Sequence, residues 1–89
     1  MLEAFFNPRS VAVIGASRSK EKLGHGVLAN LIEYGYPGQI YPINPKADEI
    51  LGLKCYPSVL DVPGPIDLAI VVIPAQFVAA VLEECGQKG

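Results

Sequence analysis

Residues 10–15 read SVAVIG, a continuous apolar run that a glycine closes. A run of this length and composition is typical of a strand buried on both faces of a parallel sheet. Residues 67–73, DLAIVVI, show the same pattern most strongly, and residues 39–44, QIYPIN, supply another strand that Pro45 ends. We expect the first and the last of these strands to be central in the sheet and adjacent to each other.

A helical pattern follows the first of these strands, and another follows the last. Apolar residues recur on one face of residues 24–36, before glycines and a proline at positions 35–38 end the segment. The second helix is expected from Pro74 to about Gly86, because proline is favoured in the first turn of a helix. The apolar positions of the two helices are Val27, Leu28, Leu31 and Ile32, and Phe77, Val78, Val81, Leu82 and Cys85.

Shorter elements connect the second strand to the last one. We expect one helical turn at residues 47–51, a short third strand at residues 53–56, and a turn that Ser58 caps and Pro63 ends. Strands that alternate with helices imply right-handed crossovers and a mainly parallel sheet. The sequence therefore predicts an α/β fold, an open parallel sheet with flanking helices, in one domain over residues 1–89.

The order of the strands decides where a ligand would bind. If the order is 3-2-1-4, the chain reverses direction between the first and the fourth strand. Ligands of such sheets bind at that point, outside the carboxyl ends of the strands. The segments facing this crevice would be residues 15–20, 44–46 and 73–77.

Composition excludes several classes of protein. With 51% hydrophobic and 18% charged residues among 89, the chain is too apolar for intrinsic disorder and long enough for one small domain. The net charge of −2 provides no broad basic field for nucleic acid. The longest apolar run, residues 68–75, is far shorter than the ~20 residues of a membrane-spanning helix, so no membrane partner is expected.

The two cysteines, Cys55 and Cys85, have no metal-like spacing and no cluster of companion ligands. An early acid, Glu3, and then Pro8 stand where the apolar core of a secretory signal would run. We therefore expect a cytoplasmic protein whose thiols are reduced and buried as small apolar groups.

The loop after the first strand, GASRSKEKLGHG at residues 15–26, does not fit the dinucleotide-binding fingerprint. That fingerprint needs G-x-G-x-x-G directly after the strand, and here only Gly15 is in place. The loop still suits a phosphate, because it joins a glycine turn and two serines to Arg18, Lys20 and Lys22 ahead of a helix N-terminus. A plain solvated loop is the alternative.

The ends of the other two strands carry further candidates. In residues 44–46, Asn-Pro-Lys, the basic residue Lys46 follows the second strand, where a basic side chain would indicate a ligand with a phosphorylated ribose. An ordinary solvated lysine is the alternative. Residues 73–75, Ile-Pro-Ala, would let a flat ligand lie against the backbone, or they simply turn the strand into a helix. His25 has neither a carboxylate nor a nucleophile beside it in the sequence, so no catalytic role is expected for it.

Three ordered segments resemble the CoA-binding domain of NDP-forming acyl-CoA synthetases. They are residues 6–17, FNPRSVAVIGAS, residues 38–46, GQIYPINPK, and residues 67–75, DLAIVVIPA. The same domain opens the α-subunit of succinyl-CoA synthetase and certain protein lysine acetyltransferases. The resemblance covers nearly the whole chain, and it implies a Rossmann-like sheet in which coenzyme A, not NAD, occupies the crevice.

By this resemblance, residues 15–19 would line the nucleotide phosphates, Lys46 would meet the phosphorylated ribose or the pyrophosphate, and residues 73–75 would border the adenine or the pantetheine. The residues expected to bind coenzyme A are Gly15, Ala16, Ser17, Arg18, Ser19, Lys20, Asn44, Pro45, Lys46, Ile73, Pro74 and Ala75. No metal ligand is expected. In the family, ligation runs through a phosphohistidine in a following domain, so this chain alone is expected to bind and not to catalyse.

The resemblance predicts the CoA-binding domain of an ADP-forming acyl-CoA synthetase, an acid–CoA ligase, completed by further domains or a subunit. The alternatives are a non-enzymatic CoA- or nucleotide-binding regulatory module, the CoA-binding domain of a protein lysine acetyltransferase, and an NADP-binding oxidoreductase fragment. Because the family's sheet continues beyond this point, we expect a fold truncated after the fourth strand and its helix. The fourth strand would then lie at an open edge, where it could pair with a second copy of the chain.

Overall fold

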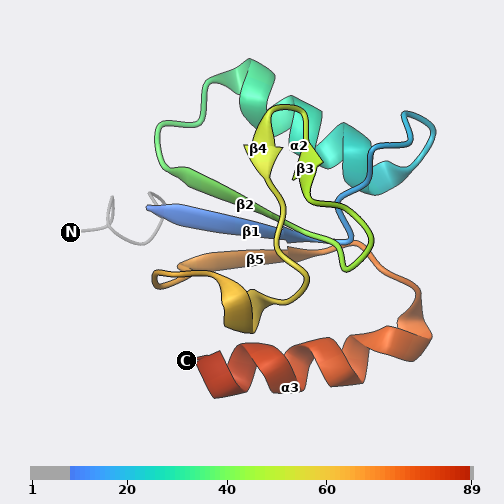
Figure 1. Ribbon diagram of the computed structural model, residues 1–89, viewed down its shortest axis with the longest axis vertical. Helices are drawn as coiled ribbons and strands as arrows, with labels where there is room; N and C mark the ends of the chain where they lie inside the picture. The colour runs from blue at the N-terminus through green and yellow to red at the C-terminus, as the bar shows by residue number, and fades with distance from the viewer. Residues whose placement is uncertain (1–8, 89) are drawn as a thin grey trace.

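A parallel sheet with strand order β2-β1-β5 organises residues 9–88, the part of the chain that the computed structural model describes. Figure 1 shows this sheet between two helices, with α2 on one face and α3 on the other. The bounds are β1 Ser10–Ile14, α2 Leu23–Tyr34, β2 Gln39–Ile43, β5 Leu68–Val71 and α3 Val78–Lys88. The predicted class, an open parallel sheet with flanking helices, is confirmed.

β1 is the central strand because its apolar side chains suit burial on both faces of the sheet. Every residue of β1 is buried, and the strand pairs in parallel with β2 on one side and β5 on the other. The predicted adjacency of the first and last strands is therefore confirmed. Within the described residues β5 is not central but an edge strand, with Leu68 46% exposed, and this is the open edge expected for the fourth strand of a truncated sheet. An apolar run indicates that a strand suits burial, not that a neighbour covers its second edge.

The outer edge of β2 carries a single bridge and a proline. The Tyr56 N–H donates to the carbonyl oxygen of Pro42, and the Asn44 N–H donates to the carbonyl oxygen of Tyr56, both at 2.9 Å. Because the carbonyl of Pro42 points to this outer edge, its missing N–H costs no bond to β1. Residue 56, β2, β1 and β5 thus follow one another across the sheet as the predicted order 3-2-1-4 requires.

Residues 47–56 differ from the prediction. β3, Glu49–Ile50, and β4, Leu53–Lys54, pair antiparallel, so the helical turn expected at 47–51 is wrong and the strand expected at 53–56 is shorter. Leu51 and Gly52 connect β3 to β4 with φ values of 52° and 81°. Two consecutive left-handed residues are the signature of a tight hairpin turn.

Side chains pack into two cores, one on each face of the sheet. The alternation of side chains along β1 directs Val11 and Val13 to the α2 face, and Ala12 and Ile14 to the α3 face. The α2-side core consists of Val11, Val13, Ala16, Leu28, Ile50 and Cys55, and the α3-side core of Ala12, Ile14, Ile43, Val59 and Val62. Both cores reach the carboxyl ends of the strands, so they support that edge from above and below.

The predicted apolar faces of the helices are only partly covered. On α2, Leu28 is fully buried whereas Ile32 is exposed. Beside and on α3, Phe77 and Leu82 are exposed, and no residue of α3 is fully buried. Cys85 is accordingly half-buried, which corrects the expectation that both cysteines are buried, although both are free thiols.

The turn that Ser58 begins and the helical segment that Pro74 begins both lie where the sequence predicts them. The 3-10 helix η1, Val59–Asp61, starts where Ser58 Oγ accepts a hydrogen bond from the Leu60 N–H at 3.2 Å. Pro74 precedes a second 3-10 turn, η2, Ala75–Phe77, which continues into α3. Over residues 9–88, neither helix has the length and apolar character needed to cross a membrane.

Candidate functional site

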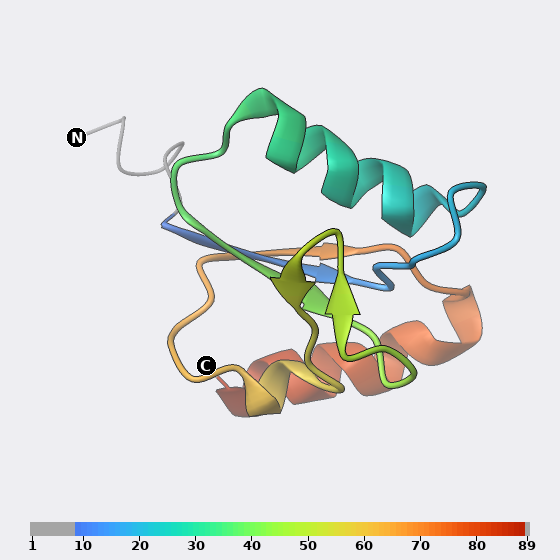
Figure 2. The ribbon, with the colours of Figure 1, turned by 45° about the horizontal axis from the view of Figure 1, so that its top comes forward.

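The carboxyl ends of β1, β2 and β5 open into a cleft of about 710 Å³. Figure 2 shows that the strands end on the side of the molecule where α2 and α3 both begin. The cleft is therefore bounded by the strand ends, by the start of α2 on one face and by the first turns of α3 on the other. This is the place where open parallel sheets bind ligands.

Two glycines let α2 approach the end of β1 closely. Gly15 has a φ of 98°, and a Cβ on it would overlap the carbonyl oxygen of Val72, the residue that follows β5. A Cβ on Gly24, in the first turn of α2, would overlap the carbonyl oxygen of Gly15. The Gly15 N–H donates to the carbonyl oxygen of Ile43 at 3.0 Å, which ties this turn to β2. The backbone at this corner of the cleft is thus held with no room for a side chain.

Asn44 connects the loop after β1 to the loop after β2. Its Nδ2 donates to the carbonyl oxygen of Ala16, and its Oδ1 accepts from the Lys46 N–H, both at 2.8 Å. The side chain thus braces one loop against the other and fixes the backbone from which Lys46 extends. An amide is suited to this because it both donates and accepts.

Replacing Asn44 by alanine is expected to lower the free energy of unfolding by about 1–3 kcal/mol, because the Ala16 carbonyl and the Lys46 N–H each lose their partner. Urea denaturation measures this loss. Asn30→Ala, on the exposed surface of α2, is the matched control and should change stability by less than about 0.5 kcal/mol. Equal effects of the two substitutions would contradict the brace.

The loop between β1 and α2 is held by its own backbone and by His25. The Ser19 N–H donates to Ser17 Oγ at 3.0 Å, and His25 Nδ1 lies 3.0 Å from the carbonyl oxygen of Ser17. A carbonyl oxygen only accepts, so Nδ1 carries the hydrogen in this contact. His25 therefore helps to order the loop. Lys22, at the N-cap of α2, has no side-chain oxygen with which to cap the helix.

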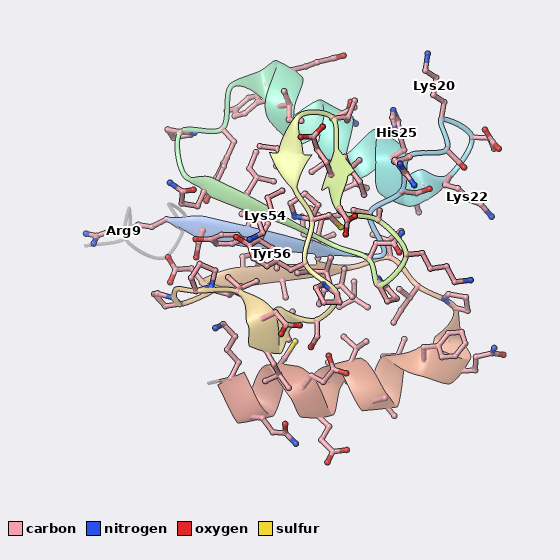
Figure 3. All side chains as sticks on the ribbon, in the orientation of Figure 1. Arg9, Lys20, Lys22, His25, Lys54 and Tyr56 are labelled. Carbon is pink, nitrogen blue, oxygen red and sulfur yellow. The ribbon has the colours of Figure 1, made fainter. Side chains whose placement is uncertain are left out.

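The structure brings most of the predicted site residues together. Those that line the cleft are Gly15, Ser17, Asn44, Pro45, Lys46, Ile73 and Pro74. Those outside its lining are Ala16, Arg18, Ser19, Lys20 and Ala75. Ala16 is buried and contributes its carbonyl oxygen to the brace, whereas Figure 3 shows Lys20 extending into solvent away from the sheet. Which of these residues touch a ligand stays a prediction.

Other residues line the cleft that the prediction did not include among the ligand-binding residues. They are Ile14, Lys22, Leu23, Gly24, Ile43, Pro57, Val59, Val72, Phe77, Ala80, Val81 and Glu84. Phe77 lies in the predicted crevice segment 73–77, and Lys22 is one of the bases in the loop that the sequence suits to a phosphate. Pro57 lies just before η1, and Glu84 lies in α3. No local sequence pattern indicates that these two segments meet at the strand ends.

The thiol of Cys55 supports the turn at Asn44 from within the α2-side core. Burial raises the pKa of the Cys55 thiol, and a hydrogen bond to the Asn44 carbonyl opposes that shift. Cys55 Sγ donates to that carbonyl oxygen at 3.6 Å. Because its pKa is raised, the thiol stays neutral at neutral pH and acts here as a small packing group.

Comparison with known sequences identifies the family. Residues 9–89 match the model of the CoA binding domain, so the chain belongs to this family of domains. It is 58% identical, over 99% of its length, to the alpha subunit of ADP-forming acetate–CoA ligase I of Pyrococcus furiosus. It is 48% identical, over 92% of its length, to the ADP-forming 4-hydroxybutyrate–CoA ligase of Nitrosopumilus maritimus. The chain spans 20% and 12% of the lengths of these two relatives.

Comparison with solved structures gives the same result. Dinucleotide-forming acetyl-coenzyme A synthetase 1 of Candidatus Korarchaeum cryptofilum, in complex with phosphate and ADP, is similar with a TM-score of 0.93 and 49% identity, over 99% of this chain and 19% of that one. A hypothetical protein of Pyrococcus horikoshii is similar with a TM-score of 0.86 and 36% identity, over 99% and 61%. The predicted family resemblance is confirmed, and coenzyme A is the ligand of this family of domains.

Proposed function

We propose that this chain serves as the CoA-binding domain of an ADP-forming acyl-CoA synthetase and holds coenzyme A in the cleft. The observation that supports this best is that residues from three separate strand ends, Gly15 and Ser17, residues 44–46, and residues 73–74, contribute to one cleft. The parent enzyme would convert acyl-CoA, ADP and phosphate to the free acid, CoA and ATP. The relatives it matches are several times longer, so further domains or a subunit would carry the phosphoryl transfer.

The phosphates of the ligand would lie where α2 begins. The N-terminus of a helix attracts anions through its N–H groups and its dipole. Gly15 and Gly24 keep side chains out of this corner, and Lys22 adds a cation beside it. Lys46, which lines the cleft shortly after the end of β2, would meet a second anionic group, the 3′-phosphate of the ribose.

Replacing Lys46 by alanine is expected to weaken the binding of coenzyme A by about 1–3 kcal/mol, the contribution of a charged hydrogen bond. The binding of dephospho-CoA, which lacks the 3′-phosphate, should weaken much less. Isothermal titration calorimetry of the unaltered chain and the variant with both ligands measures the difference. Equal losses for the two ligands would refute the contact between Lys46 and the 3′-phosphate.

Lys54→Ala is the matched control, since it removes the same charge outside the cleft. Lys54 Nζ lies 5.2 Å from the centre of the Tyr56 ring, and Figure 3 shows the two side chains together over the sheet. This variant should bind coenzyme A as the unaltered chain does. NADP serves as the competing ligand, because tight NADP binding without a response to coenzyme A would overturn the proposed function.

Two further expectations concern the location of the protein and the pairing of two copies. A cytoplasmic location fits the two free thiols, Cys55 and Cys85, which reducing compartments maintain. Pairing of two copies along the outer edge of β5 remains a prediction, and the oligomeric state in solution tests it.

A further inference from the structure

A carboxylate lies in the cleft on the side away from α2. Glu84, a half-buried residue of α3, lines the cleft, and its Oε1 accepts a hydrogen bond from Ser58 Oγ at 2.7 Å. Ser58 is fixed in turn, because its hydroxyl oxygen accepts from the Leu60 N–H at the start of η1. With Oε1 engaged, Oε2 is the carboxylate oxygen that remains for a ligand.

The charges of the cleft are arranged by element. Lys22 and the N-terminus of α2 lie on one face of the sheet, and Glu84 comes from α3 on the other face, as the positions of the helices in Figure 1 show. A carboxylate repels phosphate, so the phosphates belong beside the cations of the cleft, Lys22 near the start of α2 and Lys46 after β2. Because the charged groups of coenzyme A are all phosphates, the part of it that suits Glu84 is an uncharged part that donates a hydrogen bond.

The residues that line the cleft with Glu84 indicate which part of coenzyme A would lie beside it. Pro57, Phe77 and Val81 line the same cleft as Glu84, and Glu84 is the one carboxylate among the described lining residues. A cleft that combines these apolar side chains with one carboxylate acceptor suits a flat ring that carries one amino group. Of the parts of coenzyme A, the adenine ring with its exocyclic amine has this character.

We propose that Glu84 is the residue that selects the base of the nucleotide, with Oε2 accepting a hydrogen bond from the exocyclic amine of adenine. This inference rests on the proposed function and adds a residue that fixes which end of coenzyme A lies against α3. Ser58 is then a positioning residue, because its hydroxyl decides which oxygen of Glu84 faces the ligand.

The substitution Glu84→Gln tests the proposal through a change of preference. The Ser58 hydroxyl should hold the amide oxygen of the glutamine, which turns the amide NH₂ toward the ligand. We expect the unaltered chain to bind adenosine 3′,5′-bisphosphate about tenfold more tightly than inosine 3′,5′-bisphosphate, whose base carries an oxygen in place of the amine. E84Q should reverse this preference, as measured by calorimetry.

Two further variants separate selection from stability. Glu83→Gln, at the exposed neighbouring position of α3, should leave the preference for adenine unchanged. Adding Ser58→Ala to Glu84→Gln should abolish the reversal, because the glutamine amide is then free to rotate. A merely structural role for Glu84 would weaken both bisphosphates equally.

Three results would overturn the inference. The unaltered chain could bind the two bisphosphates equally, or E84Q could keep the preference for adenine. E84Q could also weaken 4′-phosphopantetheine while leaving both bisphosphates unaffected, which would place the pantetheine arm beside α3. In all three cases binding of coenzyme A itself would persist, so the proposed function would stand. Absence of any binding of coenzyme A by the unaltered chain would overturn that function and the inference together.

Discussion

Replacing Gly24 by alanine is expected to lower the free energy of unfolding by about 3 kcal/mol, at the upper end of the usual cost of overpacking. The added Cβ would overlap the carbonyl oxygen of Gly15. That oxygen belongs to the backbone and cannot turn aside, so α2 would have to move away from the end of β1. The same movement would displace the start of α2 from the cleft and weaken the binding of coenzyme A.

Gly26→Ala is the control for this prediction, because it makes the same substitution two residues later in α2. A Cβ on Gly26 would meet no atom within 4 Å. Alanine is the better helix former, so this variant should gain about 0.5–1 kcal/mol. Urea denaturation of both variants measures the two free energies. A gain in stability for both variants would show that helix propensity, and not the contact with Gly15, decides the effect.

Leu28→Ala should cost a comparable or larger amount, about 2–5 kcal/mol, because it opens a cavity that the surrounding core can only partly fill. Leu28 is fully buried between α2 and the sheet, in the core that contains Val13 and Ile50. It therefore couples the helix to both the central strand and the hairpin.

Leu23→Ala is the matched control on the same helix, since Leu23 is 72% exposed. It should change the free energy of unfolding by less than about 0.5 kcal/mol. A small loss for Leu28→Ala, close to that of Leu23→Ala, would mean that α2 contributes little to the stability of the fold.

The three main strands could be predicted because strands buried in a parallel sheet are apolar along their length, and β1 shows this at every position. The hairpin of β3 and β4 could not be predicted from the sequence. Its turn places Leu51 at a φ of 52°, a conformation that leucine rarely adopts and that asparagine or glycine would have signalled. Ile50, the residue before this turn, is buried in the α2-side core.

The residues of the candidate site likewise divide into those that the sequence predicts and those that it does not. Gly15, Asn44 and Pro74 follow predicted strands directly, and parallel strands bring their carboxyl ends to one edge. Glu84 and Pro57 enter the cleft because α3 crosses the opposite face of the sheet and meets the segment around η1. That meeting depends on how two elements that are distant in the sequence pack against each other. The spacing of residues within either element does not predict it.

Pro42 has a consequence for how this sheet can be extended. Tyr56 already uses the carbonyl of Pro42 and the N–H of Asn44, and residue 42 has no N–H to offer an incoming strand. Within the described part of the chain, β5 is the opposite edge and carries no such obstacle over Leu68–Val71. Extension of the sheet is therefore directional. A strand from the parent protein or from a second copy would add beside β5, and the β2 side would remain closed.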